Sequence, residues 1–242
     1  MQSKLEDVYG VILAAGNGSR LGYPNEKGGK PMVELQGKPL IYYAVLKLNE
    51  AGIKNIAVVV NPINKDIITK YLNDCKEFAV EISYIVQETP LGIAHALSLC
   101  KGFTSEHDLA LMLVDNIFEA SLKEAVIKFK KNKQKAMVFL TEVENPKAFG
   151  VANLKGDRVV DIIEKPETPP SNWAVIGFYL YDSSVYDIIK NLKPSARGEL
   201  EITDVNKSYL ALSSLTYEKL NGWWLDIGTP ENKLKGEALL KG

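Results

Sequence analysis

The feature of this sequence that most constrains its fold is a repeated alternation between short, β-rich apolar runs and longer amphipathic segments of helical period. Strands and surface helices differ in this way because their side chains alternate with periods of 2 and 3.6 residues. Repeated strand and helix units predict a mostly parallel sheet with helices on both faces. Ligands of such proteins bind at the carboxyl ends of the strands. We therefore expect an α/β protein with its site at that edge.

The alternation predicts most elements of the chain. In the first half we expect strands at 10–14, 56–60, 80–86, 109–114 and 136–141, and helices at 39–51, 64–76, 93–100 and 121–131. After Glu142 the strands are closely spaced, at 150–153, 158–163 and 174–181, which predicts an insertion that folds over the first sheet. Helices at 184–191 and 202–210, a strand at 215–220 and a last helix from Pro230 follow.

Composition excludes several classes of protein. With 242 residues and 46% hydrophobic residues, the chain can bury a core without a metal or a disulfide. Its 29 basic and 30 acidic residues give a net charge of −1, so we expect neither nucleic acid nor a membrane as partner. Cys75 and Cys100 lie in apolar helical segments and are expected to be free thiols in a reducing compartment. The N-terminal residues have no apolar stretch of signal-peptide length, and we expect a cytoplasmic protein.

The first strand runs into a glycine-rich loop that suits phosphate. Gly16 and Gly18 lack a Cβ, so main-chain N–H groups can approach phosphate oxygens, and Arg20 and Lys30 add positive charge. A dinucleotide fingerprint is excluded because Leu21 takes the place of its third small residue. A P-loop is excluded because Gly29-Lys30 is followed by proline instead of serine or threonine.

Two aspartates could hold a hard cation. Asp115 closes the strand LALMLV, and Asp226 lies in GWWLDIGT near the other end of the chain. Mg²⁺ in nucleotide sites takes one or two carboxylates plus substrate phosphates. Alone, an aspartate in such a position is more often a helix cap or a turn residue.

In this order the motifs resemble the sugar-1-phosphate nucleotidylyltransferases, most closely the glucose-1-phosphate thymidylyltransferase branch. The motifs are LAAGNGSRL with Lys30-Pro31, QETPLGIAHA, LVDN, AFGV, EKP, SNWAVIGFYLYD, SARGELEITDVNKSYL and WWLDIGT. The resemblance implies a Rossmann-like three-layer α/β/α fold with a mixed, mostly parallel central sheet and a sugar-binding lid half. It also implies one domain, with nucleotide bound mainly by 1–134, sugar phosphate mainly by 135–226, and a C-terminal helix at 227–242.

The implied activity is Mg²⁺-dependent condensation of a nucleoside triphosphate with a sugar-1-phosphate, as in dTDP-sugar and polysaccharide biosynthesis. The resemblance implies these nucleotide-binding residues: Ala14, Ala15, Gly16, Gly18, Ser19, Gln87, Pro90, Gly92 and Asp115. It implies a sugar-phosphate site of Gly150, Glu164, Lys165, Val175, Arg197 and Trp224. It implies catalytic roles for Arg20, Lys30, Lys165 and Arg197, and a metal pair of Asp115 and Asp226.

Departures from the branch leave the substrates open. Ala15, Val114 and Phe149 stand where the thymidylyltransferases commonly have glycine, glycine and tyrosine, and Ala15 is shared with uridylyl-transferring relatives. We expect dTTP and glucose-1-phosphate, with UTP as the alternative base donor. A related glycosyltransferase, a non-catalytic sugar-nucleotide regulator and a homo-oligomer also stay open. The chain ends soon after WWLDIGT, so weak or absent feedback control is expected.

The two histidines are expected to play no acid–base role. His107 lies in the polar turn TSEHD and is expected to be solvated. His95 follows Gly92 on a helix and is expected to pack or face solvent, with a secondary contact to nucleotide as the alternative. A sugar-1-phosphate oxygen is already an anionic nucleophile, so the reaction needs no general base.

Overall fold

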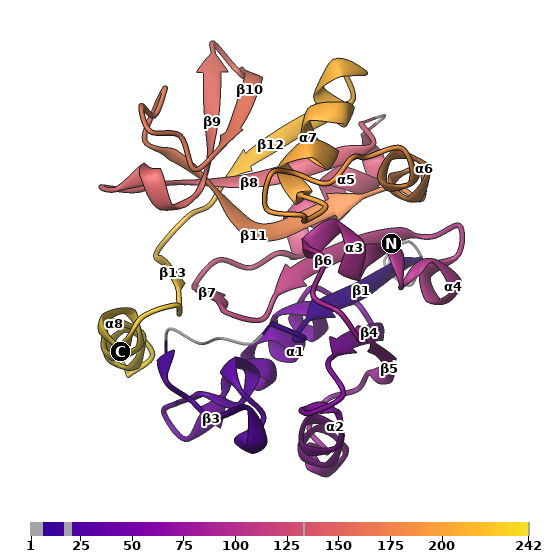
Figure 1. Cartoon of the computed structure of the whole chain (residues 1–242), viewed down its shortest axis with the longest axis vertical. Coiled ribbons are helices and arrows are strands. Elements are labelled where there is room, and N and C mark those ends of the chain that lie inside the picture. The colour runs from indigo at the N-terminus through magenta and orange to yellow at the C-terminus, as the bar shows by residue number, and fades with distance from the viewer. Residues whose placement is uncertain (1–6, 17–20, 133, 242) are drawn as a thin grey trace.

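The computed structural model describes residues 7–16, 21–132 and 134–241. Its centre is a mixed sheet of nine strands with the order β10-β9-β11-β6-β1-β4-β5, in which β8 pairs with both β11 and β12. These strands are β1 (Val8–Leu13), β4 (Asn55–Val60), β5 (Glu81–Val86), β6 (Asp108–Leu113), β8 (Ala136–Glu142), β9 (Gly150–Lys155), β10 (Arg158–Glu164), β11 (Trp173–Tyr181) and β12 (Leu215–Lys219). The expected α/β class with a mixed sheet is confirmed (Figure 1).

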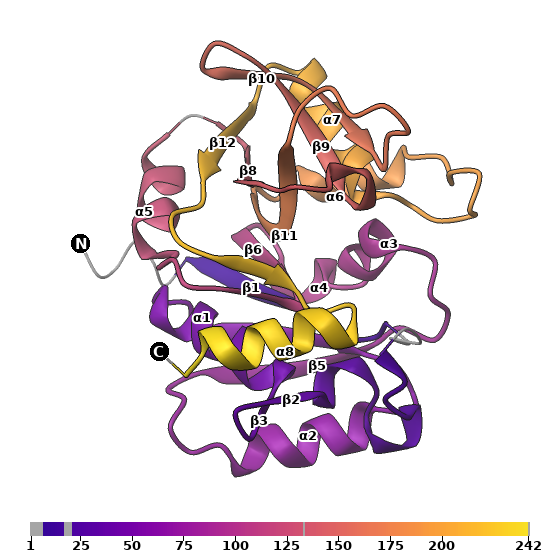
Figure 2. The ribbon, with the colours of Figure 1, turned by 90° about the vertical axis from the view of Figure 1, so that its left-hand side faces the viewer.

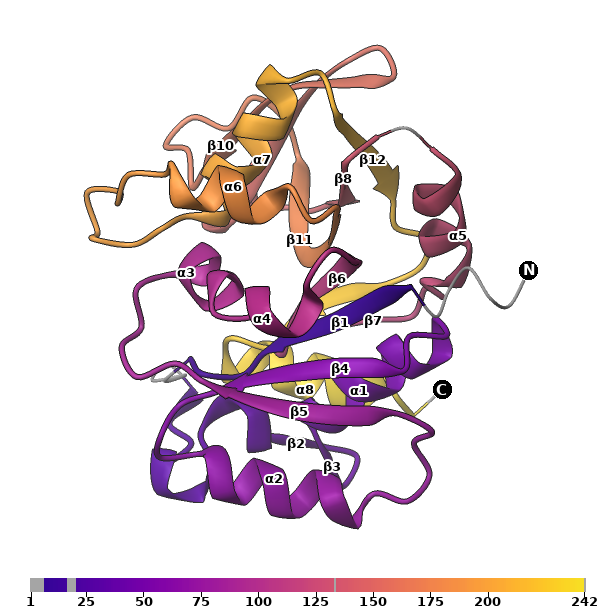
Figure 3. The ribbon, with the colours of Figure 1, turned by 90° about the vertical axis from the view of Figure 1, so that its right-hand side faces the viewer.

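The N-terminal half forms the parallel part of the sheet. β1 pairs in parallel with β4 and β6, and β4 pairs in parallel with β5, as Figure 3 shows. The helices between and after these strands are α1 (Leu40–Glu50), α2 (Lys65–Asp74), α3 (Ile93–Ser98), α4 (Lys101–Thr104) and α5 (Lys123–Lys131). The strand and helix alternation of the sequence is confirmed, with most boundaries within one or two residues of their predicted positions.

The C-terminal half extends the same sheet. β11 is antiparallel to β6, β8 and β9, and β9 and β10 form a hairpin at the sheet edge. The expectation of an insertion folded over the first sheet is wrong in this respect. β11 hydrogen-bonds directly to β6, from Tyr181 opposite Leu109 to Phe178 opposite Met112. Its residues are almost continuously buried, which is typical of a central strand covered on both faces.

Two apolar cores lie on opposite faces of the sheet because side chains alternate along each strand. Ile12 of β1 belongs to the core that contains buried residues of α1, α2 and α5, whereas the neighbouring Val11 belongs to the core under α3, α6 and α7. The remaining helices are α6 (Val185–Lys190), α7 (Ile202–Ala211) and α8 (Pro230–Leu239). Figure 3 shows α3 and α2 on opposite sides of the strands.

Small elements at the strand ends were not expected from the sequence. β7 (Asn116–Phe118) pairs with β13 (Trp224–Asp226), and β2 (Glu34–Leu35) pairs with β3 (Lys38–Pro39). Short 3-10 turns cover Asn25–Lys27, Lys30–Met32 and Pro146–Ala148. After β13 the chain returns to the N-terminal half as α8, which packs near the β2–β3 hairpin (Figure 2). Within the described part of the chain, none of the helices has the length and apolarity needed to cross a bilayer.

Candidate active site

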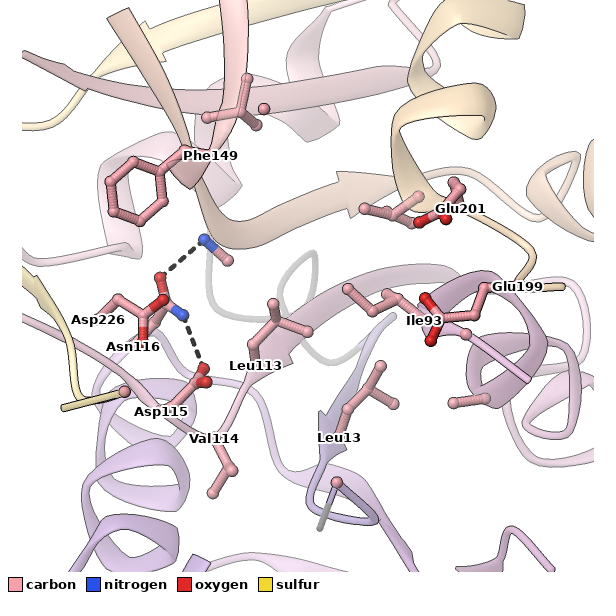
Figure 4. A pocket seen from close by; sticks show the side chains of 18 of the residues that line it. Leu13, Ile93, Leu113, Val114, Asp115, Asn116, Phe149, Glu199, Glu201 and Asp226 are labelled. Atoms are coloured by element: carbon pink, nitrogen blue, oxygen red, sulfur yellow. Dashed lines mark hydrogen bonds between the residues drawn. The ribbon is translucent and has the colours of Figure 1, made fainter. Parts of the chain in front are cut away.

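A cavity of about 440 Å³ opens at the carboxyl ends of β1, β5 and β6, between them and the C-terminal strands. Figure 4 shows its interior, with Asp115, Asn116 and Asp226 on one side and Glu199 and Glu201 on the other. The lining comes from segments far apart in sequence, with one or more residues from each of 13, 15–16, 30, 87–96, 113–116, 148–150, 164–165, 175–179, 197–202 and 224–228.

Lys30 lies between the two aspartates. Its Nζ forms an ion pair with Asp115 Oδ2 and lies 3.9 Å from Asp226 Oδ1. The strands explain how residues 111 positions apart meet: Asp226 on β13 lies opposite Asn116 on β7, and the Ile227 N–H donates to the Asp115 carbonyl at 2.8 Å. The predicted convergence of Lys30, Asp115 and Asp226 in one cleft is therefore observed.

Asn116 organises this corner, and its position was not anticipated from the sequence. It is 3% exposed. Its Nδ2 donates to Asp115 Oδ1 at 2.9 Å (Figure 4), and its Oδ1 accepts from the Gly177 N–H and from Trp224 Nε1, both at 2.8 Å. The side chain of Asn116, on β7, thus contacts the middle of β11 and the start of β13, and it holds the Asp115 carboxylate. The only sequence signal was its place beside Asp115 in LVDN.

The aspartate pair has the chemistry of a divalent-cation site that a substrate completes. Both carboxylates reach the same lysine ammonium, so both face one small volume. No group of three or more histidine, cysteine, aspartate or glutamate side chains suited to a metal occurs among the described residues. Two carboxylates fit Mg²⁺, which keeps several waters and takes substrate phosphate oxygens as its other ligands.

Another part of the wall holds the residues expected to contact a sugar. Thr203 Oγ1 donates to Glu164 Oε2 at 2.6 Å, which leaves Glu164 Oε1 facing Lys165 Nζ at 3.7 Å. Lys165 has a φ of +43°, and its N–H donates to the Phe149 carbonyl at 3.0 Å. A Cβ on Gly150 would lie 3.3 Å from Glu164 Oε2, so the glycine leaves room at this carboxylate.

Arg197 lines the cavity but is already bound to a carboxylate. Its Nη2 donates to both oxygens of Glu201, at 2.8 and 2.9 Å, and its Nε donates to Glu201 Oε1 at 3.2 Å. These hydrogen bonds raise the pKa of the Arg197 guanidinium. A phosphate group at this side would therefore share the arginine with Glu201.

The remaining wall comes from the segment after β5. Gln87 is 6% exposed, and its Nε2 lies 3.0 Å from His95 Nδ1. His95 therefore packs against Gln87, and its alternative contact with a nucleotide stays a prediction. Gly92 has a φ of +103°, and a Cβ there would lie 2.5 Å from the Leu200 carbonyl oxygen. The glycine lets its loop lie against Leu200, whose N–H donates to the Leu91 carbonyl at 2.8 Å.

The structure gathers most of the site residues expected from the sequence. The cavity lining includes Ala15, Gly16, Lys30, Gln87, Pro90, Gly92, Asp115, Gly150, Glu164, Lys165, Val175, Arg197, Trp224 and Asp226. Ala14 is fully buried outside the lining, where its carbonyl accepts from Asn64 Nδ2 at 2.9 Å. Gly18, Ser19 and Arg20 lie outside the described residues. The roles of all these residues stay predictions.

Sequence reasoning also missed the apolar part of the lining. Leu13, Leu113 and Tyr179 come from β1, β6 and β11, and Ile93 comes from α3. Burial raises the pKa of the Tyr179 hydroxyl, and the carboxylates of Glu164 and Asp115 raise it further. This hydroxyl therefore keeps its proton at neutral pH. Strand alternation could have identified these positions only if the register of β11 beside β6 had been known.

Comparison with known proteins finds relatives over nearly the whole chain. Residues 9–241 match the family model described as nucleotidyl transferase. The nucleotidyltransferase Agl11 of low-salt glycan biosynthesis from Haloferax volcanii is 42% identical over 236 residues, which are 96% of this chain and 65% of that protein. A glucose-1-phosphate thymidylyltransferase from Neisseria meningitidis is 41% identical over 228 residues, 92% of this chain and 79% of the relative.

Solved structures share the fold over nearly the whole chain. A protein assigned as a glucose-1-phosphate thymidylyltransferase from Bacillus anthracis, with sucrose bound, superposes with a TM-score of 0.90 at 42% identity and covers 96% of this chain and 94% of its own. UDP-glucose pyrophosphorylase with UDP-glucose bound superposes with a TM-score of 0.86 at 25% identity. The superposition covers 97% of this chain and 98% of the pyrophosphorylase chain.

Proposed function

Because this chain belongs to the nucleotidyl transferase family, we propose that it condenses a nucleoside triphosphate with a sugar-1-phosphate and releases pyrophosphate. dTTP and glucose-1-phosphate are the favoured substrates, since relatives named glucose-1-phosphate thymidylyltransferase are about 40% identical over most of the chain. The observation that carries the proposal is the convergence of Lys30, Asp115, Lys165 and Asp226 on one cavity.

The reaction is a displacement at the α-phosphorus. An anionic oxygen of the sugar-1-phosphate forms the new bond to that phosphorus, while the bond to the oxygen that bridges to the β-phosphate breaks and its electron pair leaves with pyrophosphate. The nucleophile carries no proton, so no side chain needs to remove one. This agrees with the placement of the two histidines, since His95 contacts Gln87 and His107 stacks on Tyr9.

The main obstacle is repulsion between two anionic substrates, and the lysines of the cavity counter it. A unit positive charge about 4 Å from a phosphate oxygen contributes roughly 4 kcal/mol at an effective dielectric constant near 20. Lys30 would exchange one carboxylate partner for the triphosphate, and Lys165 would meet the sugar phosphate beside Glu164. Arg20, which lies outside the described residues, and Arg197 are proposed to add positive charge.

Asp115 and Asp226 are proposed to hold Mg²⁺ together with the triphosphate. When bound, the cation would neutralise phosphate charge and favour the leaving pyrophosphate. Asn116 supports this role because its amide fixes one oxygen of Asp115. The apolar lining, including Leu13 and Leu113, would exclude water and strengthen these electrostatic contacts.

Incubation of the protein with Mg²⁺, each nucleoside triphosphate and a panel of sugar-1-phosphates, with pyrophosphate release as the readout, tests the proposal. We expect release with dTTP and glucose-1-phosphate, and loss of most of it in Lys165→Ala. Lys155→Ala, at the exposed end of β9, is the matched control and should keep the wild-type rate. If no pair of substrates released pyrophosphate, the proposed activity would be refuted and a sugar-nucleotide regulator would be favoured.

UTP is the alternative base donor. Two observations favour testing it: the structural likeness to UDP-glucose pyrophosphorylase, and Ala15, which lines the cavity. If kcat/KM is higher for UTP than for dTTP, UTP is the preferred substrate, and the proposed reaction type is unchanged.

A further inference from the structure

The amide of Gln87 is held in place at the wall of the cavity. Gln87 follows β5, its main-chain N–H donates to the Val60 carbonyl at 2.8 Å, and its side chain is 6% exposed. His95 lies on α3, and its ring Nδ1 is 3.0 Å from Gln87 Nε2. Within the described residues no other side chain or main-chain group hydrogen-bonds to this amide. One contact therefore decides which way the amide points.

An amide has two unlike ends. The nitrogen of a glutamine can only donate, so His95 Nδ1 acts as the acceptor in this contact. The amide oxygen and the second N–H of the nitrogen are then left for a ligand. If the ring donated instead, the amide would turn and exchange these two groups.

We propose that His95 is a positioning residue that orients the Gln87 amide and thereby selects uracil or thymine against cytosine. This inference depends on the proposed function, in which the cavity takes a pyrimidine nucleotide. Uracil and thymine present an N–H donor at N3 beside an acceptor oxygen at C4. Cytosine presents an acceptor at N3 beside an amino donor. For a base that places N3 opposite the amide oxygen and C4 opposite the amide nitrogen, the observed orientation would match the first pair and the turned orientation the second.

The size of the effect follows from the hydrogen bond that holds the amide. A single neutral hydrogen bond contributes about 0.5–1.5 kcal/mol, which corresponds to roughly two- to twelvefold in an equilibrium constant. A mismatched amide places a donor against a donor, which adds to the discrimination. We therefore expect a change of about three- to tenfold in nucleotide preference when the contact with His95 is removed.

The test is direct binding of UTP and of CTP, each with Mg²⁺ and without sugar-1-phosphate, measured by calorimetry. These nucleotides differ only at N3 and C4 of the base. His95→Leu removes the acceptor, so the ratio of CTP to UTP dissociation constants should fall about three- to tenfold. His95→Lys offers only donors, so the amide should turn and the ratio should fall further.

Ser98→Ala is the matched control on the same helix, because the one side-chain hydrogen bond of Ser98 within the described residues goes to the His95 carbonyl and not to its ring. It should keep the wild-type ratio. In kinetic assays His95→Leu should raise the KM for the nucleotide and leave the KM for the sugar phosphate unchanged. If His95 had a purely structural role, His95→Leu would change both KM values or would lower the melting temperature.

The outcomes separate the two proposals. If the wild-type protein binds no nucleoside triphosphate, the proposed function fails. If it binds UTP and CTP equally, or if His95→Leu and His95→Lys keep the wild-type ratio, the inference about His95 is overturned while the transferase proposal stands.

Discussion

At the scale of single residues, Asn116 determines much of the geometry of the cavity. It is a buried amide whose donor and acceptor sides are both used, toward Asp115, Gly177 and Trp224. A buried polar group left without a partner costs about 1–3 kcal/mol, so these contacts hold one another in place. The proposed metal pair is therefore positioned by a residue that binds no metal itself.

Asp226→Asn should lower the turnover of the pyrophosphate-releasing reaction about a hundredfold or more, because it removes a negative charge where a cation would sit. The change keeps the shape of the side chain, so the melting temperature should change little. Asp157→Asn, on the exposed turn between β9 and β10, is the control. Wild-type turnover in Asp226→Asn would remove this residue from the site.

Gly177→Ala should disturb the same corner by steric contact. A Cβ there would lie 2.5 Å from Asn116 Nδ2 and 2.8 Å from Leu113 Cδ1. We expect a loss of about 1–3 kcal/mol in the free energy of unfolding, measured by urea denaturation, together with a loss of activity. Gly102→Ala on α4 is the control, since a Cβ there meets nothing within 4 Å. Equal stability of both variants would show that the corner can relax.

At the scale of secondary-structure elements, β11 carries most of what joins the two halves. It pairs with β6, β8 and β9, and its register shifts between Val175 and Tyr179. The side chains of Tyr179 and Tyr181 stack at 5.9 Å between ring centroids, and Tyr181 stacks on Tyr209 of α7 at 5.6 Å. This column of rings fixes α7, and with it Thr203 beside Glu164, against the sheet.

The tyrosine column should make the protein sensitive to alkali. Burial raises the pKa of Tyr181 and of Tyr209 well above the ordinary value of 10.0. Below pH 10 both tyrosines are protonated in the folded and in the unfolded chain, so their contribution to stability is complete. Above pH 10 they ionise in the unfolded chain but stay protonated in the folded one, so this contribution is lost as pH rises. Each such tyrosine contributes up to about 1.4 kcal/mol per pH unit to this loss.

Tyr181→Phe should therefore show a shallower fall in the free energy of unfolding between pH 10 and about pH 11.5 than the wild type does. At pH 7 the variant should be less stable by about 1–2 kcal/mol, because Tyr181 donates a hydrogen bond of 2.6 Å to Asn206. Urea denaturation at both pH values checks both parts. Parallel alkaline slopes would contradict the assignment of this loss to Tyr181.

At the scale of the whole molecule, the cavity lies between the N-terminal strands and the C-terminal strands, so a ligand there would stabilise both halves at once. A ligand at one hundred times its dissociation constant adds about 2.7 kcal/mol to the free energy of unfolding. For a chain of this length that corresponds to a rise of roughly 5–10 °C in the melting temperature. We expect this rise with dTTP and Mg²⁺.

Removal of Mg²⁺ by EDTA should reverse most of this rise, because dTTP without the cation would meet the negatively charged carboxylates of Asp115 and Asp226. The protein without nucleotide should melt at the same temperature with or without EDTA. A rise that survives EDTA would argue that the lysines alone hold the triphosphate and that the aspartate pair serves another purpose.

The order of the longer strands and helices was determined by the sequence alone, because apolar periodicity and glycine positions act within short stretches of chain. The positions of Gly16, Gln87 and Asp115 at strand ends followed from the same pattern. Only the tertiary structure decided that β11 joins β6, that Asn116 joins three strands, and that His95 contacts Gln87. Those contacts depend on register and on side-chain direction between segments distant in sequence, and a one-residue shift in register would turn each side chain to the other face.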